Sequence, residues 1–308
     1  MLNLILLIVS LFIVIKSADF AVKYAYQLAQ KLKIPKYTIG FIIVAIISIM
    51  PEGFIAITSA LQGIPAFGLG TLFGSNVADL TLVFALVILS SKNNIKINSK
   101  FLKDNKFYSL ILAIPIIFGL DGYYSRTEGL VLIMTGLFFY YLIFKKNNKQ
   151  PLEKDKEKIS HYKSLLFLIL SVIILLLGSN LTIKYGVAFA QNINLNPILI
   201  AMLIVGLGTT LPELLFSIRA AQKKQADLAL GDILGTVISD ATILVGVIAL
   251  IKPFDFSPRI VYSTAIFMFI ASLVLFAFMR SGKVLSKKEA WLLFAFYIIF
   301  VLTEYLIS

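Results

Sequence analysis

Long runs of apolar residues, separated by short polar stretches, dominate the whole chain. A helix crosses the hydrocarbon core of a bilayer, which is about 30 Å thick, with about 20 such residues. We therefore expect ten membrane-spanning helices and an all-α integral membrane protein. The predicted spans cover residues 2–30, 37–61, 66–90, 107–120, 128–144, 164–190, 197–219, 226–251, 259–279 and 289–307.

Part of this pattern is present twice, and the interval between the two copies is constant. Pro51-Glu52 corresponds to Pro212-Glu213, and Asp79 corresponds to Asp240. A match in register at this many polar positions, without a gap, indicates an internal duplication. The same interval also relates Ser48 to Thr209, Gly70 to Gly231, Ser75 to Thr236, and Lys23-Tyr24 to Lys184-Tyr185.

Lysine and arginine are distributed unequally between the predicted loops. Of the 28 in the chain, 22 lie in loops that follow odd-numbered spans, and only 3 lie in loops that follow even-numbered spans. Cytoplasmic loops of membrane proteins carry an excess of these residues. The distribution therefore predicts a multi-pass plasma-membrane protein whose two termini are both extracellular.

One polar segment divides the spans into two groups of five. We expect a first repeat at 1–144, a cytoplasmic linker at 145–163 and a second repeat at 164–308. Because five is odd, the second repeat would enter the membrane from the opposite face. Inverted repeats with broken helices and a site near the midplane are typical of secondary transporters.

Composition limits the possible chemistry. The chain is 59% hydrophobic, has a mean hydropathy of +0.93, and contains no cysteine and one histidine. These counts exclude thiolate zinc sites, iron–sulfur clusters and histidine-rich metal sites, so a bound metal would need oxygen ligands and would be a hard cation. The net charge of +12 follows from the loop distribution and does not indicate nucleic-acid binding. We find no nucleophile–base pair or phosphate loop in the spans, so we expect no enzyme, no cofactor and no obligate protein partner.

Four carboxylates of the duplicated pattern stand inside the predicted spans: Glu52, Asp79, Glu213 and Asp240. A charged side chain at the centre of a bilayer costs about 2.5–3.5 kcal/mol on insertion scales. No lysine or arginine in spans 2, 3, 7 or 8 lies near enough in sequence to pair with them. We expect their partners to be cations, protons, or hydroxyl and backbone groups. The alternative is a set of protonated acids that hydrogen-bond between helices without binding an ion.

The residues around these acids supply further oxygen atoms. A hydroxyl residue stands four positions before each acid, on the same helix face. Pro51 and Pro212 lack an N–H group, so we expect helices 2 and 7 to be broken there, with carbonyl oxygens left free. The hydroxyl residues are Ser48, Ser75, Thr209 and Thr236, and Ala45 and Gly206 lie one further turn back in helices 2 and 7.

These motifs resemble the calcium/cation antiporter superfamily, specifically the prokaryotic sodium/calcium exchangers. Residues 208–213, Gly-Thr-Thr-Leu-Pro-Glu, stand where the family has Gly-Thr-Ser-Leu-Pro-Glu, and residues 74–79 also resemble the family motif. The resemblance implies that Glu52 and Glu213 bind calcium. It further implies that spans 1 and 6 slide across the bundle to alternate access. The implied ligands of flanking sodium ions are Ser48, Thr209, Thr210, Ser75, Thr236 and Asp240, with the carbonyls of Ala45 and Gly206.

The chain departs from the family pattern at several positions. Ile49 stands where the family has a hydroxyl ligand, and Asp79 stands where many members have asparagine, which adds a fourth carboxylate. The leading hypothesis is sodium/calcium exchange. A proton-coupled exchanger of calcium, magnesium or another divalent cation is the first alternative, because four acids exceed the charge of one divalent ion. A gated cation channel is the second.

Overall fold

The computed structural model describes residues 2–31, 36–91, 94–96, 107–146, 161–222, 226–281 and 284–307. Almost all of them are helical, as the apolar runs predicted. In the first half the segments are α1 (Leu2–Lys31), α2 (Lys36–Leu61), α3 (Pro65–Ala78), the π-helical η1 (Asp79–Val83), α4 (Phe84–Ser90), α6 (Phe107–Phe118), the short 3-10 turn η2 (Gly119–Asp121) and α7 (Arg126–Lys146).

The second half repeats this order. Its segments are α8 (His161–Asn192), α9 (Pro197–Ile200), the π-helical η3 (Ala201–Val205), α10 (Gly206–Thr209), α11 (Leu211–Gln222), α12 (Ala226–Ile238), the π-helical η4 (Ser239–Leu244), α13 (Val245–Ile251), α14 (Pro258–Ser281) and α15 (Lys287–Ile307). Seven helical runs among the described residues are long and apolar enough to cross a membrane. The remaining three of the ten expected spans stay a prediction. The linker expected at 145–163 lies for the most part outside the described residues.

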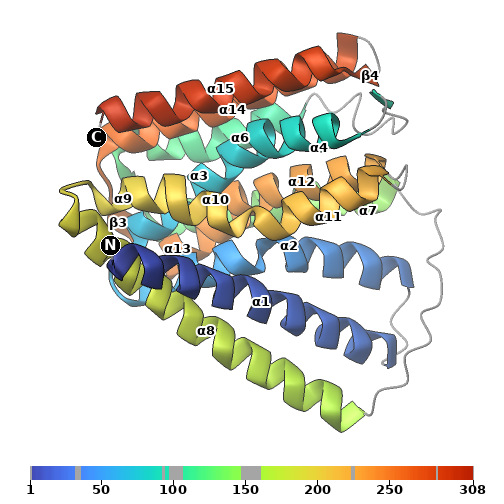
Figure 1. Cartoon of the computed structure of the whole chain (residues 1–308), viewed down its shortest axis with the longest axis horizontal. Helices are drawn as coiled ribbons and strands as arrows, with labels where there is room; N and C mark the ends of the chain where they lie inside the picture. The colour runs from blue at the N-terminus through green and yellow to red at the C-terminus, as the bar shows by residue number, and fades with distance from the viewer. Residues whose placement is uncertain are drawn as a thin grey trace.

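Two short antiparallel strand pairs tie loops together at the two ends of the bundle. β1 (Ile95–Lys96) pairs with β4 (Val284–Leu285), and β2 (Tyr123–Tyr124) pairs with β3 (Phe254–Asp255). In Figure 1, β4 lies at the right-hand end, whereas β3 and both termini lie at the left-hand end.

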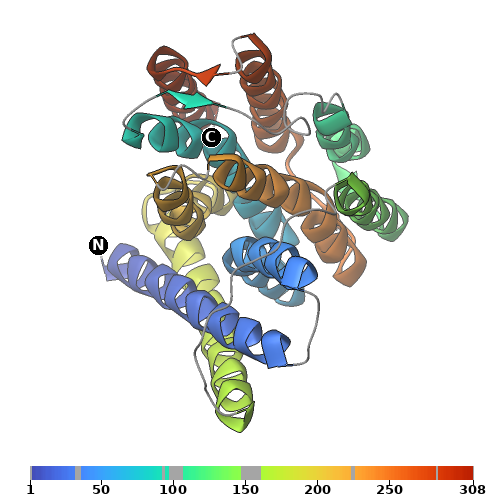
Figure 2. The same cartoon turned by 90° about the vertical axis from the view of Figure 1, so that its right-hand side faces the viewer.

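The helices pack into a large bundle and a separate pair. The α1 and α8 helices lie together along one edge of the molecule, and α14 and α15 form the opposite edge (Figure 1). Figure 2 shows α1 crossing α8. Side chains of this pair, such as Leu7, Val14 and Leu175, belong to one buried cluster. A second and larger cluster runs through α3, α4, α12, α13 and α14.

The two prolines behave differently from each other. The α2 helix continues from Lys36 to Leu61 with Pro51 inside it, so the break expected there is not seen. A proline removes one helical hydrogen bond, and a helix can pass through it with a local bend. In the second half a turn at Thr210 separates α10 from α11, just before Pro212. Neither proline break is therefore established as it was expected.

Candidate functional site

Four buried acids lie at the centre of the bundle, on four different helical segments. Glu52 stands in the middle of α2, and Glu213 stands in the first turn of α11. Asp79 opens η1, and Asp240 lies in η4. All are buried, with exposed fractions of 2% for Glu213 and 0% for the other three. Helix packing thus brings side chains far apart in sequence into one interior region.

These acids lie within electrostatic reach of one another. Glu213 is repelled by Asp79, Glu52 and Asp240, and Asp240 is repelled by Glu52 and Asp79. Among the described residues, no basic side chain forms an ion pair with any of them. In the same part of the chain, the side-chain oxygens of Glu52, Asp79 and Glu213 meet no donor at hydrogen-bonding distance. Negative charge in such a position needs cations or protons to balance it.

The hydroxyl groups connect the two halves of the chain. The Ser75 hydroxyl donates to Asp240 Oδ2 over 3.3 Å, although in sequence it shares a helix face with Asp79. The Thr209 hydroxyl lies close to Glu52. Each of these hydroxyls therefore sits beside an acid of the other sequence copy. Thr236 is buried as well, and its hydroxyl has no hydrogen-bond partner among the described residues.

Four of the predicted ligands need comment. The Gly206 carbonyl accepts hydrogen bonds from the Thr209 hydroxyl over 2.9 Å and from the Thr210 N–H over 3.2 Å, so both of its lone pairs are already used. The side chains of Ala45 and Ser48 lie outside the described residues. Thr210 is buried, and its hydroxyl donates to the Leu207 carbonyl. Either threonine hydroxyl would have to turn to expose a carbonyl to an ion.

Both aspartates of the cluster lie in π-helical segments, which the sequence analysis did not predict. Single π-turns inside α-helices are rare and often occur at functional sites. The hydroxyls of Thr81 and Thr242 donate to the Val77 and Ile238 carbonyls, four residues earlier in each case. These threonines correspond to each other in the duplication, and each stands two positions after its aspartate. The repeated threonine is the feature of the sequence that could have indicated the two π-helical segments.

Two tyrosines beside the cluster were also missed. The Tyr108 hydroxyl donates to the Leu234 carbonyl over 2.9 Å, and the Tyr140 hydroxyl donates to the Gly235 carbonyl over 3.0 Å. Both tyrosines lie within electrostatic reach of Asp240. They come from α6 and α7 and have no tyrosine at the corresponding position of the second half. The duplication therefore gave no indication of them.

The sequence allows two interpretations of Asp232, which stands eight residues before Asp240: a helix N-terminal acid near the cytoplasm, which is the favoured one, or an acid in the vestibule of the cluster. In the structure, Asp232 is the seventh residue of α12 and is only 7% exposed. It lies within electrostatic reach of Asp79 and Glu213. It stands one helical turn before Thr236, on the same face. Asp232 therefore borders the acidic cluster, as the less favoured interpretation had it.

The acids are near one another without forming a ready-made metal shell. Within the described residues, no group of three or more acidic or histidine side chains is placed closely enough to hold a metal ion together. A hard cation here would therefore be bound by one or two carboxylates with hydroxyl and carbonyl oxygens.

Known proteins share this fold over nearly the full chain. A crystal structure described as an H+/Ca2+ exchanger CAX superposes with a TM-score of 0.78, at 16% identity, over 99% of this chain and 84% of that one. The sodium-calcium exchanger NCX_Mj, from a crystal soaked with Na+ and Sr2+, gives a TM-score of 0.65 at 25% identity, over 97% of each chain. The backbone thus fits CAX better, although the sequence is nearer to NCX_Mj.

A curated relative covers the same length. The sodium/calcium exchanger MaX1 of Methanosarcina acetivorans is 24% identical over 99% of both chains. The model of the family described as sodium/calcium exchanger protein matches residues 2–146 and again residues 163–306. The proteins of this family and the structural neighbours are transporters and not enzymes. The chain belongs to the sodium/calcium exchanger protein family.

Proposed function

We propose that this protein is a secondary active antiporter that exchanges calcium for sodium by alternating access. The observation that carries the proposal is the cluster of four buried carboxylates, Glu52, Asp79, Glu213 and Asp240, with no basic partner in the described part of the chain. Hard cations with oxygen ligands suit such a cluster. Membership of the exchanger family supports the same conclusion.

Charge balance explains why such a site would exchange ions. Four ionised acids around one divalent ion leave a net charge of −2, which a low-dielectric interior disfavours. Several sodium ions, or one calcium ion with further cations or protons, would bring the charge closer to zero. Three or more sodium ions together with one calcium ion would give the site an excess of positive charge, so calcium should leave when that many sodium ions bind. Mutual exclusion of this kind is what coupled exchange requires.

The proposed architecture is ten spans in two inverted repeats of five. Two capping motifs support it: Ser125 with Glu128 at the start of α7, and Ser286 with Glu289 at the start of α15. They occupy corresponding positions of the duplication and make the same reciprocal hydrogen bonds. Their neighbouring strands, β2 and β4, belong to pairs at opposite ends of the bundle (Figure 1). Equivalent parts of the two copies at opposite ends are what an inverted repeat produces.

The separate packing of α1 and α8 supports a moving pair. Their shared buried cluster, which also includes Ile55 of α2 and Phe67 of α3, is distinct from the main core. Leu11 of α1 reaches the span that bears Glu213 at Gly208. A Cβ atom at Gly208 would lie 3.0 Å from Leu11 Cδ1. In the proposal, this pair slides across the acidic cluster while the main core stays in place. The basic loops at 145–163 and elsewhere face the cytoplasm.

Proton coupling is the second candidate. Asp79 favours it, because this fourth carboxylate is fully buried and faces Glu52 and Glu213. Coupled acids of this kind can share protons as a group. A proton would then take the place of one sodium ion in the cycle.

Transport by the purified full chain in proteoliposomes tests the proposal. Calcium uptake should follow an imposed sodium gradient and persist when a protonophore removes the pH gradient. Calcium uptake that is driven only by a pH gradient would show that the exchange is coupled to protons and not to sodium. Calcium conductance without any counter-transport would contradict antiport altogether.

A further inference from the structure

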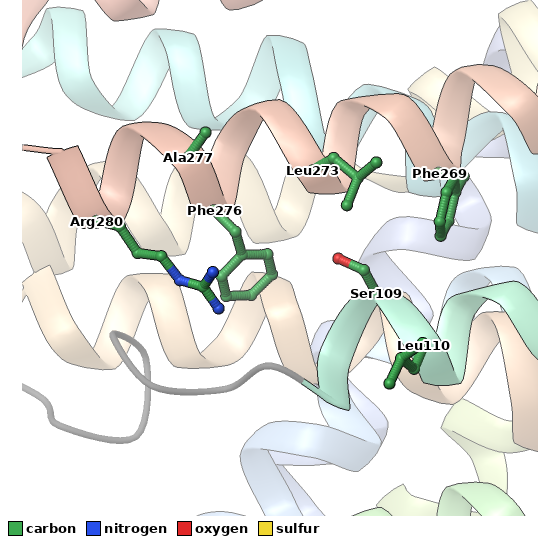
Figure 3. Close-up of a pocket in the computed structure, with 7 residues that line it drawn as sticks. All are labelled: Ser109, Leu110, Phe269, Leu273, Phe276, Ala277 and Arg280. Carbon is green, nitrogen blue, oxygen red and sulfur yellow. The ribbon is translucent and has the colours of Figure 1, made fainter.

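A groove on the surface of the bundle lies between α6 and α14, away from the acidic cluster. It has a volume of about 400 Å³ and is lined by Ser109, Leu110, Phe269, Leu273, Phe276, Ala277 and Arg280. Ser109 and Leu110 lie on α6 and the other lining residues lie on α14, and Figure 3 shows their side chains. A volume of this size is typical of pockets that hold a small ligand.

The walls of the groove are apolar and face outwards. Leu110 is 60% exposed and Leu273 is 48% exposed, and they stand on opposite walls. The hydroxyl group of Ser109 in the groove already has a hydrogen-bond partner, because it accepts a hydrogen bond from the Ser272 hydroxyl over 3.1 Å. In a membrane protein, an open apolar wall of this kind is covered by hydrocarbon. The groove is therefore suited to an acyl chain and not to a polar solute.

One end of the groove carries a positive charge. Arg280 lies in the last turn of α14 and is exposed, and its side chain lies alongside the Phe276 ring (Figure 3). Among the described residues it has no acidic partner. Basic residues at the cytoplasmic end of transmembrane helices attract anionic lipid headgroups.

We infer that this groove binds an anionic phospholipid, with one acyl chain between Leu110 and Leu273 and the phosphate on the Arg280 guanidinium. A guanidinium can bind a phosphate through two parallel hydrogen bonds. The occupant must combine a long apolar chain with an anionic head, which matches the two ends of the groove. Inorganic phosphate matches only one of them.

The groove is connected to the acidic cluster through a chain of side-chain contacts. The Phe276 ring, which forms part of the groove wall, contacts the Tyr108 ring with centroids 4.9 Å apart. The Tyr108 hydroxyl holds the Leu234 carbonyl of α12 and lies near Asp79 and Asp240. Occupation of the groove would thus stabilise the wall that supports the acidic cluster. The binding site itself does not depend on which ions are exchanged.

Lipid binding to the delipidated full chain, followed by native mass spectrometry, tests this inference. Phosphatidylglycerol should bind about fivefold more tightly than phosphatidylcholine, since one basic residue at a membrane surface contributes about that factor. Arg280→Gln should remove this preference. Lys288→Gln, at an exposed basic residue of α15 beyond the groove, is the matched control and should keep it.

Two further variants test the acyl-chain position. Leu273→Trp and, from the opposite wall, Leu110→Trp fill the groove and should reduce phosphatidylglycerol retention severalfold. Both sites are exposed, so the fold should tolerate the larger side chain, and a thermal unfolding curve checks this. The inference is overturned if the preference survives Arg280→Gln, if Lys288→Gln removes it equally, or if both tryptophan variants retain lipid as the wild type does.

Discussion

Each half of the molecule has a pair of glycines four residues apart, and the two pairs pack very differently. The pairs are Gly70 and Gly74 on α3, and Gly231 and Gly235 on α12. On α3, a Cβ atom added to Gly74 would lie 2.2 Å from the Met202 carbonyl oxygen, and one added to Gly70 would lie 2.9 Å from Ile198. On α12, a Cβ atom at Gly231 would meet nothing within 4 Å among the described residues. One at Gly235 would meet only the Tyr140 hydroxyl, 3.6 Å away. One copy is in backbone contact, and the other makes no such contact with the described residues.

This difference between the two glycine pairs bears on how an inverted duplication could alternate between two states. Two copies with the same motif can form the same contact in turn, but an antiporter must not open both sides at once. The hydroxyl positions follow the same asymmetry, because Ser75 reaches Asp240 whereas Thr236 has no hydrogen-bond partner among the described residues. In the proposed transport cycle, the close contacts beside α3 would form in one state and the equivalent contacts beside α12 in the other. Alternation would exchange the roles of the two glycine pairs.

The largest effect is expected from Glu213→Gln, which removes one charge from the cluster shared by the two halves. Breaking a buried charge interaction costs about 3–5 kcal/mol, so sodium-driven calcium uptake should fall by a factor of about a hundred or more. The thermal unfolding temperature should change little, because glutamine has nearly the same shape. Wild-type exchange by this variant would remove Glu213 from the site.

Substitutions of the glycines test the asymmetry itself. Gly74→Ala should destabilise the protein by about 1–3 kcal/mol, because the added methyl group overlaps the Met202 backbone. Gly231→Ala is the matched change in the copy without such a contact among the described residues, and it should be neutral or stabilising by up to about 1 kcal/mol, as is usual inside a helix. Thermal unfolding in one detergent compares them. Equal destabilisation by both variants would contradict the asymmetry.

Asp79→Asn tests whether protons share the cluster. Fewer acids repel one another less, so the remaining ones should take up protons less readily. The acid limb of the uptake–pH profile should therefore begin at a lower pH than in the wild type. Calcium binding at neutral pH should change less than this profile does. An unchanged pH profile would speak against proton sharing through Asp79.

The smallest effect is expected from a buried acid outside the cluster. Glu304 of α15 is fully buried and accepts hydrogen bonds from the Ser263 and Thr264 hydroxyls, over 2.8 Å and 2.7 Å. Glu304→Gln keeps an oxygen acceptor for both hydroxyls, so exchange should stay near the wild-type rate. This variant is also the control for Glu213→Gln. A loss as large as that of Glu213→Gln would show that burial alone, and not the cluster, makes an acid essential.

The sequence alone was enough to predict a membrane protein, to recognise the family resemblance and to single out the four acids, because these follow from composition and from a repeat in register. It did not predict that Ser75 would face Asp240, since spacing reports only on neighbours along one helix. The π-turns at Asp79 and Asp240 were missed because helix periodicity does not distinguish them from α-turns. The continuous helix through Pro51 was missed because propensity overstates the disruption by a proline that packing can compensate. Tyr108 and Tyr140 lay outside the duplicated pattern.

Equilibrium calcium binding by the purified full chain, measured at increasing sodium concentration and at two pH values, tests the central claim most directly. If four buried acids form one cation site, sodium or protons should displace calcium competitively, and Glu213→Gln should abolish calcium binding. Calcium binding that is insensitive to both sodium and pH, or that persists in Glu213→Gln, would contradict the account.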